Sequence, residues 1–239
     1  MPIHHSTFFK ESALAHQLLD GLENLEVGGA AHNAFGVPTL NVDRVSHTHP
    51  DFQPYASEQM RLGGAIMPVD IVAPGDCIPV DDQSFDSVIS SHVIEHFYDP
   101  ISAIKEWMRI SRQYIFIIAP QRDALESDRD KPLTGLEEHI ERFRISRAFE
   151  FTPIEVQSGL DRTPIDAAHA AISAHIASRI DRKIHTDEHH SRWTCQSFCE
   201  MCEWIFKQDF GAGWTVFATE DPDLKVGNGF CVVLKKTEV

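Results

Sequence analysis

Apolar and polar residues follow one another in blocks that predict strands and helices in alternation. Runs rich in apolar and β-branched residues predict buried strands at residues 25–29, 39–43, 65–73, 85–91 and 114–120. Runs of this kind are typical of a parallel sheet that helices cover on both faces. Two further runs, 214–220 and 230–235, are joined by the turn-rich segment DPDLKVGNG and predict an antiparallel hairpin.

The residues between these runs have the spacing and the capping residues of helices. Apolar positions in residues 7–22 recur at helical intervals, and Ser6 is the expected N-cap. Another helix is expected to start at Asp99 and Pro100, because aspartate is a favoured N-cap and proline is tolerated at the first helical position. The pattern as a whole predicts an α/β fold.

A long polar segment rich in histidine, residues 121–194, follows the fifth predicted strand. It has no strand signal, and its apolar spacing predicts helices at residues 136–151 and 164–180. Segments this long usually have a function or a structure of their own. We expect residues 121–194 to form a helical lid that defines a substrate pocket, within a single domain of residues 1–239. An oligomerisation or structural appendage is the alternative.

The most specific pattern lies between residues 84 and 110, where a buried strand, an acidic–histidine turn and a capped helix follow one another. The residues that keep the spacing sFDxVxsxhvxEHxxdP are Phe85, Asp86, Val88, Ser90, His92, Val93, Glu95, His96, Asp99 and Pro100. This pattern resembles that of the class I S-adenosylmethionine-dependent methyltransferases, in particular the type 11-like branch. The resemblance implies a Rossmann-like, doubly wound seven-stranded sheet with a C-terminal antiparallel hairpin and a helical insertion after strand five.

The resemblance also implies S-adenosylmethionine as the cofactor and a set of residues that bind it. Glu26, Gly28 and Gly29 stand where the family has its glycine-rich turn, although the third glycine is not matched. Asp43 ends the second strand, where a carboxylate can accept hydrogen bonds from the ribose hydroxyls. Only residues 30–38 separate the first two strands, so the usual crossover helix is expected to be reduced or lost.

Three further positions complete the predicted cofactor site. Asp76 lies next to the loop position that often binds the adenine amino group in relatives, with a solvated loop carboxylate as the alternative. Ser91 and His92 lie at the carboxyl end of the fourth strand, where open α/β sheets bind their ligands.

Histidines are the candidates for acid–base chemistry. A hydroxyl acceptor must lose a proton, and imidazole can take up a proton near neutral pH. The candidate catalytic residues are His92, His96, His189 and His190. The last two belong to the segment HTDEHH, residues 185–190, which we favour as the source of the base. His185, Asp187 and His189 are weaker candidates for metal ligands, because their spacing matches no standard metal motif, and a solvated loop is a further interpretation.

Two other motifs have both a functional and a structural interpretation. Cys195, Cys199 and Cys202 match the CxxxCxxC spacing of iron–sulfur ligands, but this spacing also puts them on one face of a helix, which we favour. Residues 127–130 (SDRD) resemble the metal-binding DxD motif of glycosyltransferases, yet we expect a solvated loop there.

Composition narrows the choice of partners. The formal net charge of -15 argues against nucleic acid as the main partner, since phosphate binding depends on clustered Lys and Arg. No apolar run is long enough to span a membrane, and the N-terminus lacks the apolar region of a signal peptide. We therefore expect a cytoplasmic protein with a small-molecule acceptor and no membrane partner, and a homo-oligomer stays open.

Three functions follow from these patterns. The favoured one is S-adenosylmethionine-dependent methyl transfer to a small polar acceptor, a hydroxyl of a sugar or nucleotide-sugar. One alternative is a metal-dependent enzyme that uses the cluster at His185–His190. The other is a non-catalytic S-adenosylmethionine-binding regulatory protein, because the glycine turn is incomplete.

Overall fold

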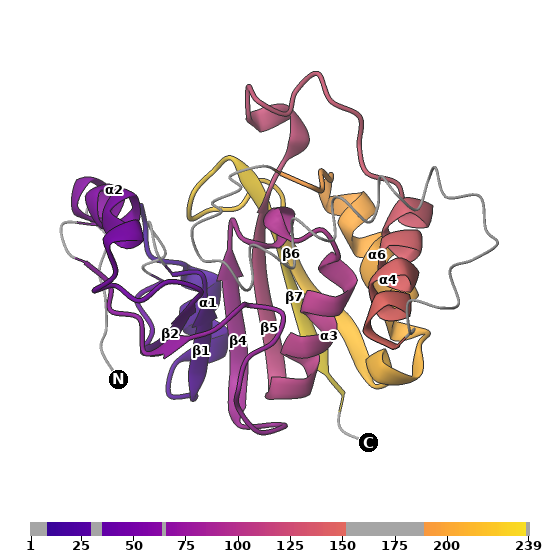
Figure 1. Cartoon of the computed structure of the whole chain (residues 1–239), viewed down its shortest axis with the longest axis horizontal. Helices are drawn as coiled ribbons and strands as arrows, with labels where there is room; N and C mark the ends of the chain where they lie inside the picture. Colours follow the sequence, from indigo (N-terminus) through magenta and orange to yellow (C-terminus); the bar gives the residue numbers. More distant parts are fainter. Residues whose placement is uncertain (1–8, 30–34, 64–65, 152–188, 238–239) are drawn as a thin grey trace.

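The computed structural model describes residues 9–29, 35–63, 66–151 and 189–237 (Figure 1). They form a seven-stranded sheet in the order β3-β2-β1-β4-β5-β7-β6. Its strands are β1 (Asn24–Val27), β2 (Thr39–Asp43), β3 (Ile71–Val72), β4 (Phe85–Ser91), β5 (Ser111–Pro120), β6 (Trp214–Glu220) and β7 (Gly229–Lys236). The first five strands run parallel, and β7 is antiparallel to both β5 and β6. The predicted sheet and its C-terminal antiparallel hairpin are confirmed.

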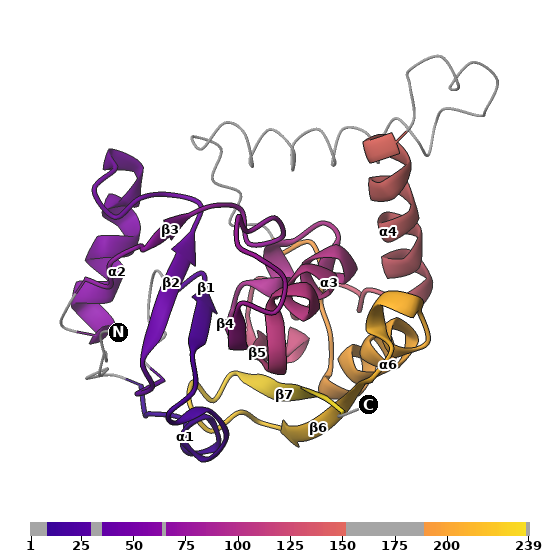
Figure 2. The ribbon, with the colours of Figure 1, turned by 90° about the horizontal axis from the view of Figure 1, so that it is seen from below.

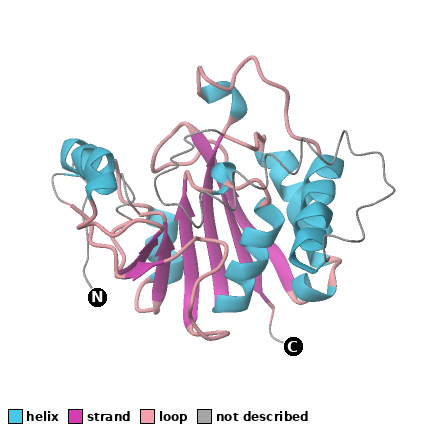
Figure 3. Ribbon diagram, viewed as in Figure 1, coloured by secondary structure: helices cyan, strands magenta, loops and turns pink. Residues whose placement is uncertain are grey.

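Helices cover both faces of this sheet (Figures 2 and 3). The α-helices of the described residues are α1 (Ala13–Leu19), α2 (Gln53–Gly63), α3 (Pro100–Ile110), α4 (Leu136–Phe151) and α6 (Cys195–Phe206). Short 3-10 helices are η1 (Pro50–Phe52), η2 (Ile94–His96), η3 (Arg122–Ala124) and η5 (Asp209–Gly211). The helices α3, α4 and α6 pack on one face, and α1 packs on the other. Within the described ranges, no helix is both long and apolar enough to cross a membrane.

Successive side chains of the central strands point to opposite faces of the sheet, and both faces are covered, which explains why these sequences are apolar throughout. Ile115 and Ile117 of β5 belong to the core under α3 and α6, whereas Phe116 and Ile118 belong to the core under α1. All four side chains are buried. Because both faces are covered, a continuous apolar run is needed instead of an alternating one.

Helix α1 is shorter than the sequence predicted. It begins directly after Ser12, because the hydroxyl of this residue accepts a hydrogen bond from the Ala15 amide at 3.1 Å and caps the helix. Residues 9–12 are not helical, so the start predicted for the helix at residues 7–22 is wrong. The expected cap, Ser6, lies outside the described residues.

Helix α3 begins where the sequence predicted. The carboxylate of Asp99 accepts hydrogen bonds from the amide and the hydroxyl of Ser102, at 3.0 Å and 2.6 Å. Pro100 follows as the first helical residue. Ile104 and Trp107 on the inner face are fully buried against the sheet. The helix therefore holds the preceding turn, η2, at the carboxyl end of β4.

We expect Asp99→Ala to lower the free energy of unfolding by about 1 kcal/mol, because the first turn of α3 loses its side-chain acceptor. Asp99→Asn keeps an acceptor oxygen, so its loss should be less than about half as large. Chemical denaturation of both variants measures the difference. Equal losses would show that the cap does not act through this hydrogen bond.

The described part of residues 121–194 includes one of the two helices predicted there. Helix α4 has the predicted bounds and packs against α3 and α6. Its Phe143 ring contacts the rings of Trp204 in α6 and Phe210 in η5. The helix predicted at residues 164–180 lies outside the described residues.

The three cysteines of the CxxxCxxC motif lie on α6, as the helical interpretation predicted. Cys195 and Cys202 are buried beside Phe198 and Ile205 on the face that meets the sheet. Burial of this face accounts for the spacing of the motif.

Candidate active site

A glycine turn follows β1 at the edge of the sheet where the parallel strands end. Gly28 adopts the left-handed conformation, with φ of 72°, and its amide donates to the Val42 carbonyl at 2.8 Å. Any side chain there would place its Cβ 2.4 Å from Cγ2 of Val93. Glycine is needed for both reasons, and the turn lies directly against the chain that leaves β4.

Two buried polar side chains, Asn41 and Glu26, lie next to this turn. The Gly29 amide donates to Oδ1 of Asn41 at 3.1 Å. Glu26 is buried and accepts a hydrogen bond from the Thr39 hydroxyl at 3.2 Å. Burial raises the pKa of Glu26, and the positive charge of Lys225 opposes this shift. Glu26 is therefore a buried side chain that is bonded to β2 and lies close to Gly29.

Two predicted carboxylates lie at the same edge. Asp43 ends β2 and is half-buried, and its Oδ1 accepts a hydrogen bond from the Val45 amide at 3.4 Å. Burial raises the pKa of Asp43 to about 6, against the hydrogen bonds and the charge that Val45 and Arg44 provide, so it is ionised at neutral pH. Asp76 is close enough to Asp99 that its charge adds to the burial that raises the pKa of Asp99.

The end of β4 has an uncommon backbone. Ser91 is buried, and His92 adopts a φ of 53°, which few residues other than glycine do. The His92 amide donates to the Ile118 carbonyl at 2.9 Å, which ties this turn to β5. Backbone conformations of this kind cluster at functional turns.

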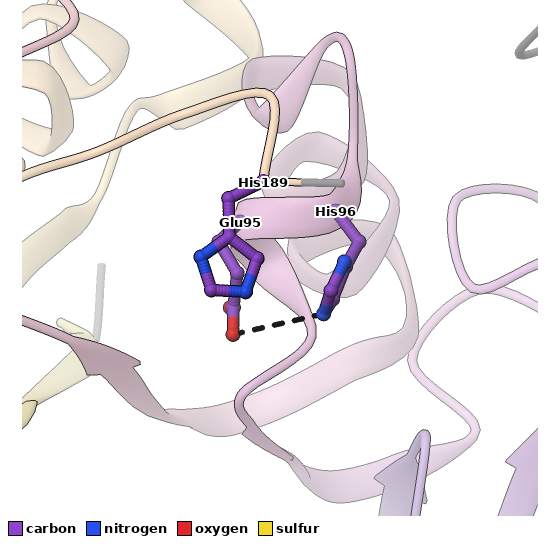
Figure 4. Close-up of side chains that lie close together, drawn as sticks. All are labelled: Glu95, His96 and His189. Atoms are coloured by element: carbon purple, nitrogen blue, oxygen red, sulfur yellow. Dashed lines mark ion pairs between the residues drawn. The ribbon is translucent and has the colours of Figure 1, made fainter. Parts of the chain in front are cut away.

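Glu95 is the centre of a polar cluster directly after β4 (Figure 4). Its side chain is 1% exposed, and its Oε1 lies 3.7 Å from Nδ1 of His92 and 3.9 Å from Nε2 of His96. Among the described residues, neither carboxylate oxygen has a hydrogen-bond partner. Burial, with a further contribution from the charge of Asp128, raises the pKa of Glu95 to about 8. A buried carboxylate is costly unless a cation or a hydrogen-bond donor meets it.

Residues 189–193 lie across this turn although they are distant in the sequence. The amides of His190 and Ser191 donate to the Glu95 carbonyl at 2.8 Å and 3.2 Å. Arg142 of α4 donates to the His190 carbonyl at 2.9 Å and to the Ser191 hydroxyl at 3.2 Å. These bonds fix the segment by its backbone.

Trp193 anchors the same segment in the core. It is fully buried, and its indole donates from Nε1 to Nε2 of His139 at 2.9 Å. Burial lowers the pKa of His139 to about 3, so the imidazole is neutral and can accept this bond. The Arg122 amide donates to the Trp193 carbonyl at 3.1 Å, which places the segment at the carboxyl end of β5.

His189 reaches the cluster from this anchored segment. Its Nδ1 lies 2.5 Å from Oδ2 of Asp128, and its ring centroid lies 4.8 Å from that of His96. Asp128 is 2% exposed, and its other oxygen lies 3.4 Å from Nε of Arg192. The solvated loop expected at residues 127–130 is therefore wrong for Asp128. Figure 4 shows Glu95, His96 and His189 converging.

The structure brings three of the four predicted catalytic histidines to the Glu95 turn, namely His92, His96 and His189. The ring of the fourth, His190, packs 6.1 Å from the ring of Tyr98 instead. The predicted metal candidates His185 and Asp187 lie outside the described residues.

Sequence reasoning missed two parts of this cluster. It did not assign Glu95 as the centre or Asp128 as the partner of His189. The signal for Glu95 was its place in the acidic–histidine turn, and the signal for Asp128 was the SDRD run, whose burial no local pattern indicates.

Comparison with protein families gives one match. Residues 29–117 match the model of a methyltransferase domain. The match covers less than half of the chain, and it includes β2, β4, η2 and α3. No curated protein matches the chain significantly.

Solved structures with a similar arrangement include an S-adenosylmethionine-dependent methyltransferase from Methanosarcina mazei, 15% identical, with 95% of this chain and 98% of that chain covered and a TM-score of 0.47. Magnesium protoporphyrin IX methyltransferase from Synechocystis PCC 6803, with bound S-adenosylhomocysteine, is 9% identical, with 94% and 78% covered and a TM-score of 0.44. At these values, neither similarity bears on the acceptor of this chain.

Proposed function

We propose that this chain is a class I S-adenosylmethionine-dependent methyltransferase and that it methylates a hydroxyl of a small polar acceptor, a sugar or nucleotide-sugar. The match of residues 29–117 to a methyltransferase domain supports this proposal. The observation that supports this acceptor is the polar cluster of Glu95, His96 and His189 beside the strand ends. Carboxylate and imidazole groups suit a ligand with several hydroxyls.

The residues at the ends of β1 and β2 fit the cofactor. The Gly28 turn presents backbone without a side chain. The ionised carboxylate of Asp43 can accept hydrogen bonds from both ribose hydroxyls. Bound S-adenosylmethionine supplies a methyl group on a sulfonium, which is an excellent leaving group. Glu26 and Gly29 are proposed to hold the turn in its binding conformation.

The remaining predicted residues divide between the cofactor and the acceptor. Asp76 is proposed to contact the adenine, and Ser91 and His92 to line the cofactor at the end of β4. His190 is proposed to shape the pocket wall, because its ring packs on Tyr98.

Alignment of the hydroxyl with the methyl group is the main contribution of the protein, and positioning of this kind is worth several kcal/mol. An oxygen acceptor also loses its proton during transfer. We propose His96 and His189 as the catalytic candidates that act on that hydroxyl, because both lie beside the buried Glu95 side chain. Residues 121–194 are proposed to border the acceptor, since both described ends of the segment lie at the end of β5.

Calorimetric titration with S-adenosylhomocysteine tests the cofactor assignment, because this product binds the same pocket and cannot react. We expect one site with a Kd in the micromolar range, which corresponds to a binding free energy of about -8 kcal/mol. Labelled S-adenosylmethionine and a panel of hydroxylated acceptors then test transfer. Absence of binding, with or without added divalent metal, would contradict the assignment. Binding without transfer to any acceptor would support the non-catalytic regulatory interpretation instead.

A further inference from the structure

We propose that Glu95, His96 and His189 bind one divalent transition-metal ion of the zinc class at the acceptor side of the site. The metal site itself is independent of the proposed function. Its role in methyl transfer rests on that function: His96 and His189 would act on the acceptor hydroxyl as ligands of the metal and not as free bases.

The three side chains are close enough to share an ion. One ligand atom from each lies within 4.8 Å of the other two, and Oε1 of Glu95 is 3.9 Å from Nε2 of His96. Ligand atoms around one tetrahedral zinc ion at 2.0–2.2 Å would lie about 3.4 Å apart. Contraction by up to about 1.4 Å is therefore required, and rotation of the side chains would provide it.

The Glu95 carboxylate is the strongest indication of a cation. It is 1% exposed and lies between the imidazoles of His92 and His96 at distances longer than hydrogen bonds. Within the described ranges, neither of its oxygens has a hydrogen-bond partner in another residue. A buried carboxyl group whose oxygens lack hydrogen bonds is costly, and a bound metal ion would satisfy both oxygens.

The contact between His189 and Asp128 supplies a second, independent indication. Asp128 is within hydrogen-bond distance of Nδ1 of His189. When Nδ1 donates this bond, the neutral imidazole keeps its lone pair on Nε2 for a ligand. A carboxylate that orients a histidine in this way is typical of metal ligands. Arg192 and Lys131 face Asp128 at 3.4 Å and 3.7 Å, and they balance its buried charge.

The donor set indicates the kind of metal. Two imidazoles and one carboxylate are ligands of zinc, iron and manganese, and they are poor ligands for Mg²⁺ and Ca²⁺, which prefer oxygen. Three protein ligands leave a coordination position open, as in catalytic zinc sites. An acceptor hydroxyl bound to the metal at that position would have a lower pKa than the free hydroxyl.

The transfer step then balances without a further reactant. The hydroxyl proton leaves to solvent, and an oxygen lone pair forms the bond to the methyl carbon. The carbon–sulfur bond breaks with its electron pair remaining on sulfur, which yields S-adenosylhomocysteine and the methyl ether.

Metal binding is tested on the full chain after removal of metal by chelation. Calorimetric titration with Zn²⁺ alone should give one site per chain, and elemental analysis after dialysis should give about one zinc per chain. Glu95→Gln and His189→Gln should each weaken this site by more than about 100-fold, because each removes a ligand. Asp128→Asn, which removes only the orienting charge, should weaken it by about 10- to 100-fold.

His190→Gln is the matched control, because it removes an adjacent imidazole whose ring packs on Tyr98 and keeps the backbone bonds to Glu95 and Arg142. It should retain the Zn²⁺ affinity of the unmodified protein. Cobalt substitution adds a spectroscopic readout, since the visible bands of Co²⁺ should appear with the unmodified protein and disappear with His189→Gln.

The outcomes are separable from folding and from the cofactor assignment. Glu95→Gln removes a metal-binding carboxyl group and keeps the shape of the side chain, so it should fold and still bind S-adenosylhomocysteine. Loss of Zn²⁺ binding with intact S-adenosylhomocysteine binding would support the site. Absence of stoichiometric Zn²⁺ binding, or equal affinity in all four variants, would overturn it.

Discussion

Asp43→Asn is expected to weaken the binding of S-adenosylhomocysteine by about 100-fold. The carboxylate at the end of β2 is half-buried and ionised at neutral pH. Hydrogen bonds to a charged acceptor are worth about 1.5–3 kcal/mol each, so the weakening of two of them accounts for about 3 kcal/mol. Calorimetry on both proteins at pH 8 measures the change. An affinity within threefold of the unmodified protein would show that Asp43 does not bind the ribose.

The same residue predicts a pH dependence. Burial raises the pKa of Asp43 to about 6, so the carboxylate that we propose to accept hydrogen bonds from the ribose hydroxyls is present above pH 6 and is lost below it. The affinity of the unmodified protein should therefore be constant above about pH 7 and fall up to about tenfold per pH unit below pH 6. Asp43→Asn should lack this decrease. Parallel profiles for the two proteins would assign the titration to another group.

Trp193→Ala should lower the free energy of unfolding by about 3–5 kcal/mol, the cost typical of removing a fully buried tryptophan. The indole stacks on His139 at 5.3 Å between centroids and contacts the Phe198 ring edge-to-face at 5.2 Å. Its removal creates a cavity and leaves Nε2 of His139 without its donor. Denaturant titration measures the loss.

Trp193→Phe is the matched control. It keeps an aromatic ring in the same place and removes the indole donor, so its cost should be clearly smaller, about 1–3 kcal/mol for the unpaired acceptor and lost volume. If Trp193→Ala cost less than about 1 kcal/mol, residues 189–193 would not be anchored by the indole. This result would contradict the claim that the burial of Trp193 holds His189 at the polar cluster.

The sequence by itself was enough to predict the strand, turn and helix of residues 85–110. An apolar run, an Asp99 cap and a proline at the first helical position are local signals, and each acts within a few residues. The C-terminal hairpin was predictable for the same reason, because turn-rich residues separate two short apolar runs. Gly28 also behaves as its residue type predicts, with a positive φ.

Local signals were insufficient where two positions offered the same chemistry. Ser6 and Ser12 are both good helix caps by residue type, and the sequence favoured the first. Packing decided for Ser12, because the helix that starts there buries Ala15 and Leu19 against the sheet. The energy of that burial is invisible in the periodicity of the segment alone.

Only the tertiary structure decided the composition of the polar cluster. Sequence pointed to histidines on both sides of it, but it could not pair His189 with Asp128 or place His189 beside Glu95 and His96. These residues come from three segments that meet only because β4 and β5 are neighbours and Trp193 is buried. Contacts between segments that are distant in the sequence are marked by no periodicity and no capping residue. The local sequence therefore determined the helices and strands, and the packing of these elements determined which side chains share a site.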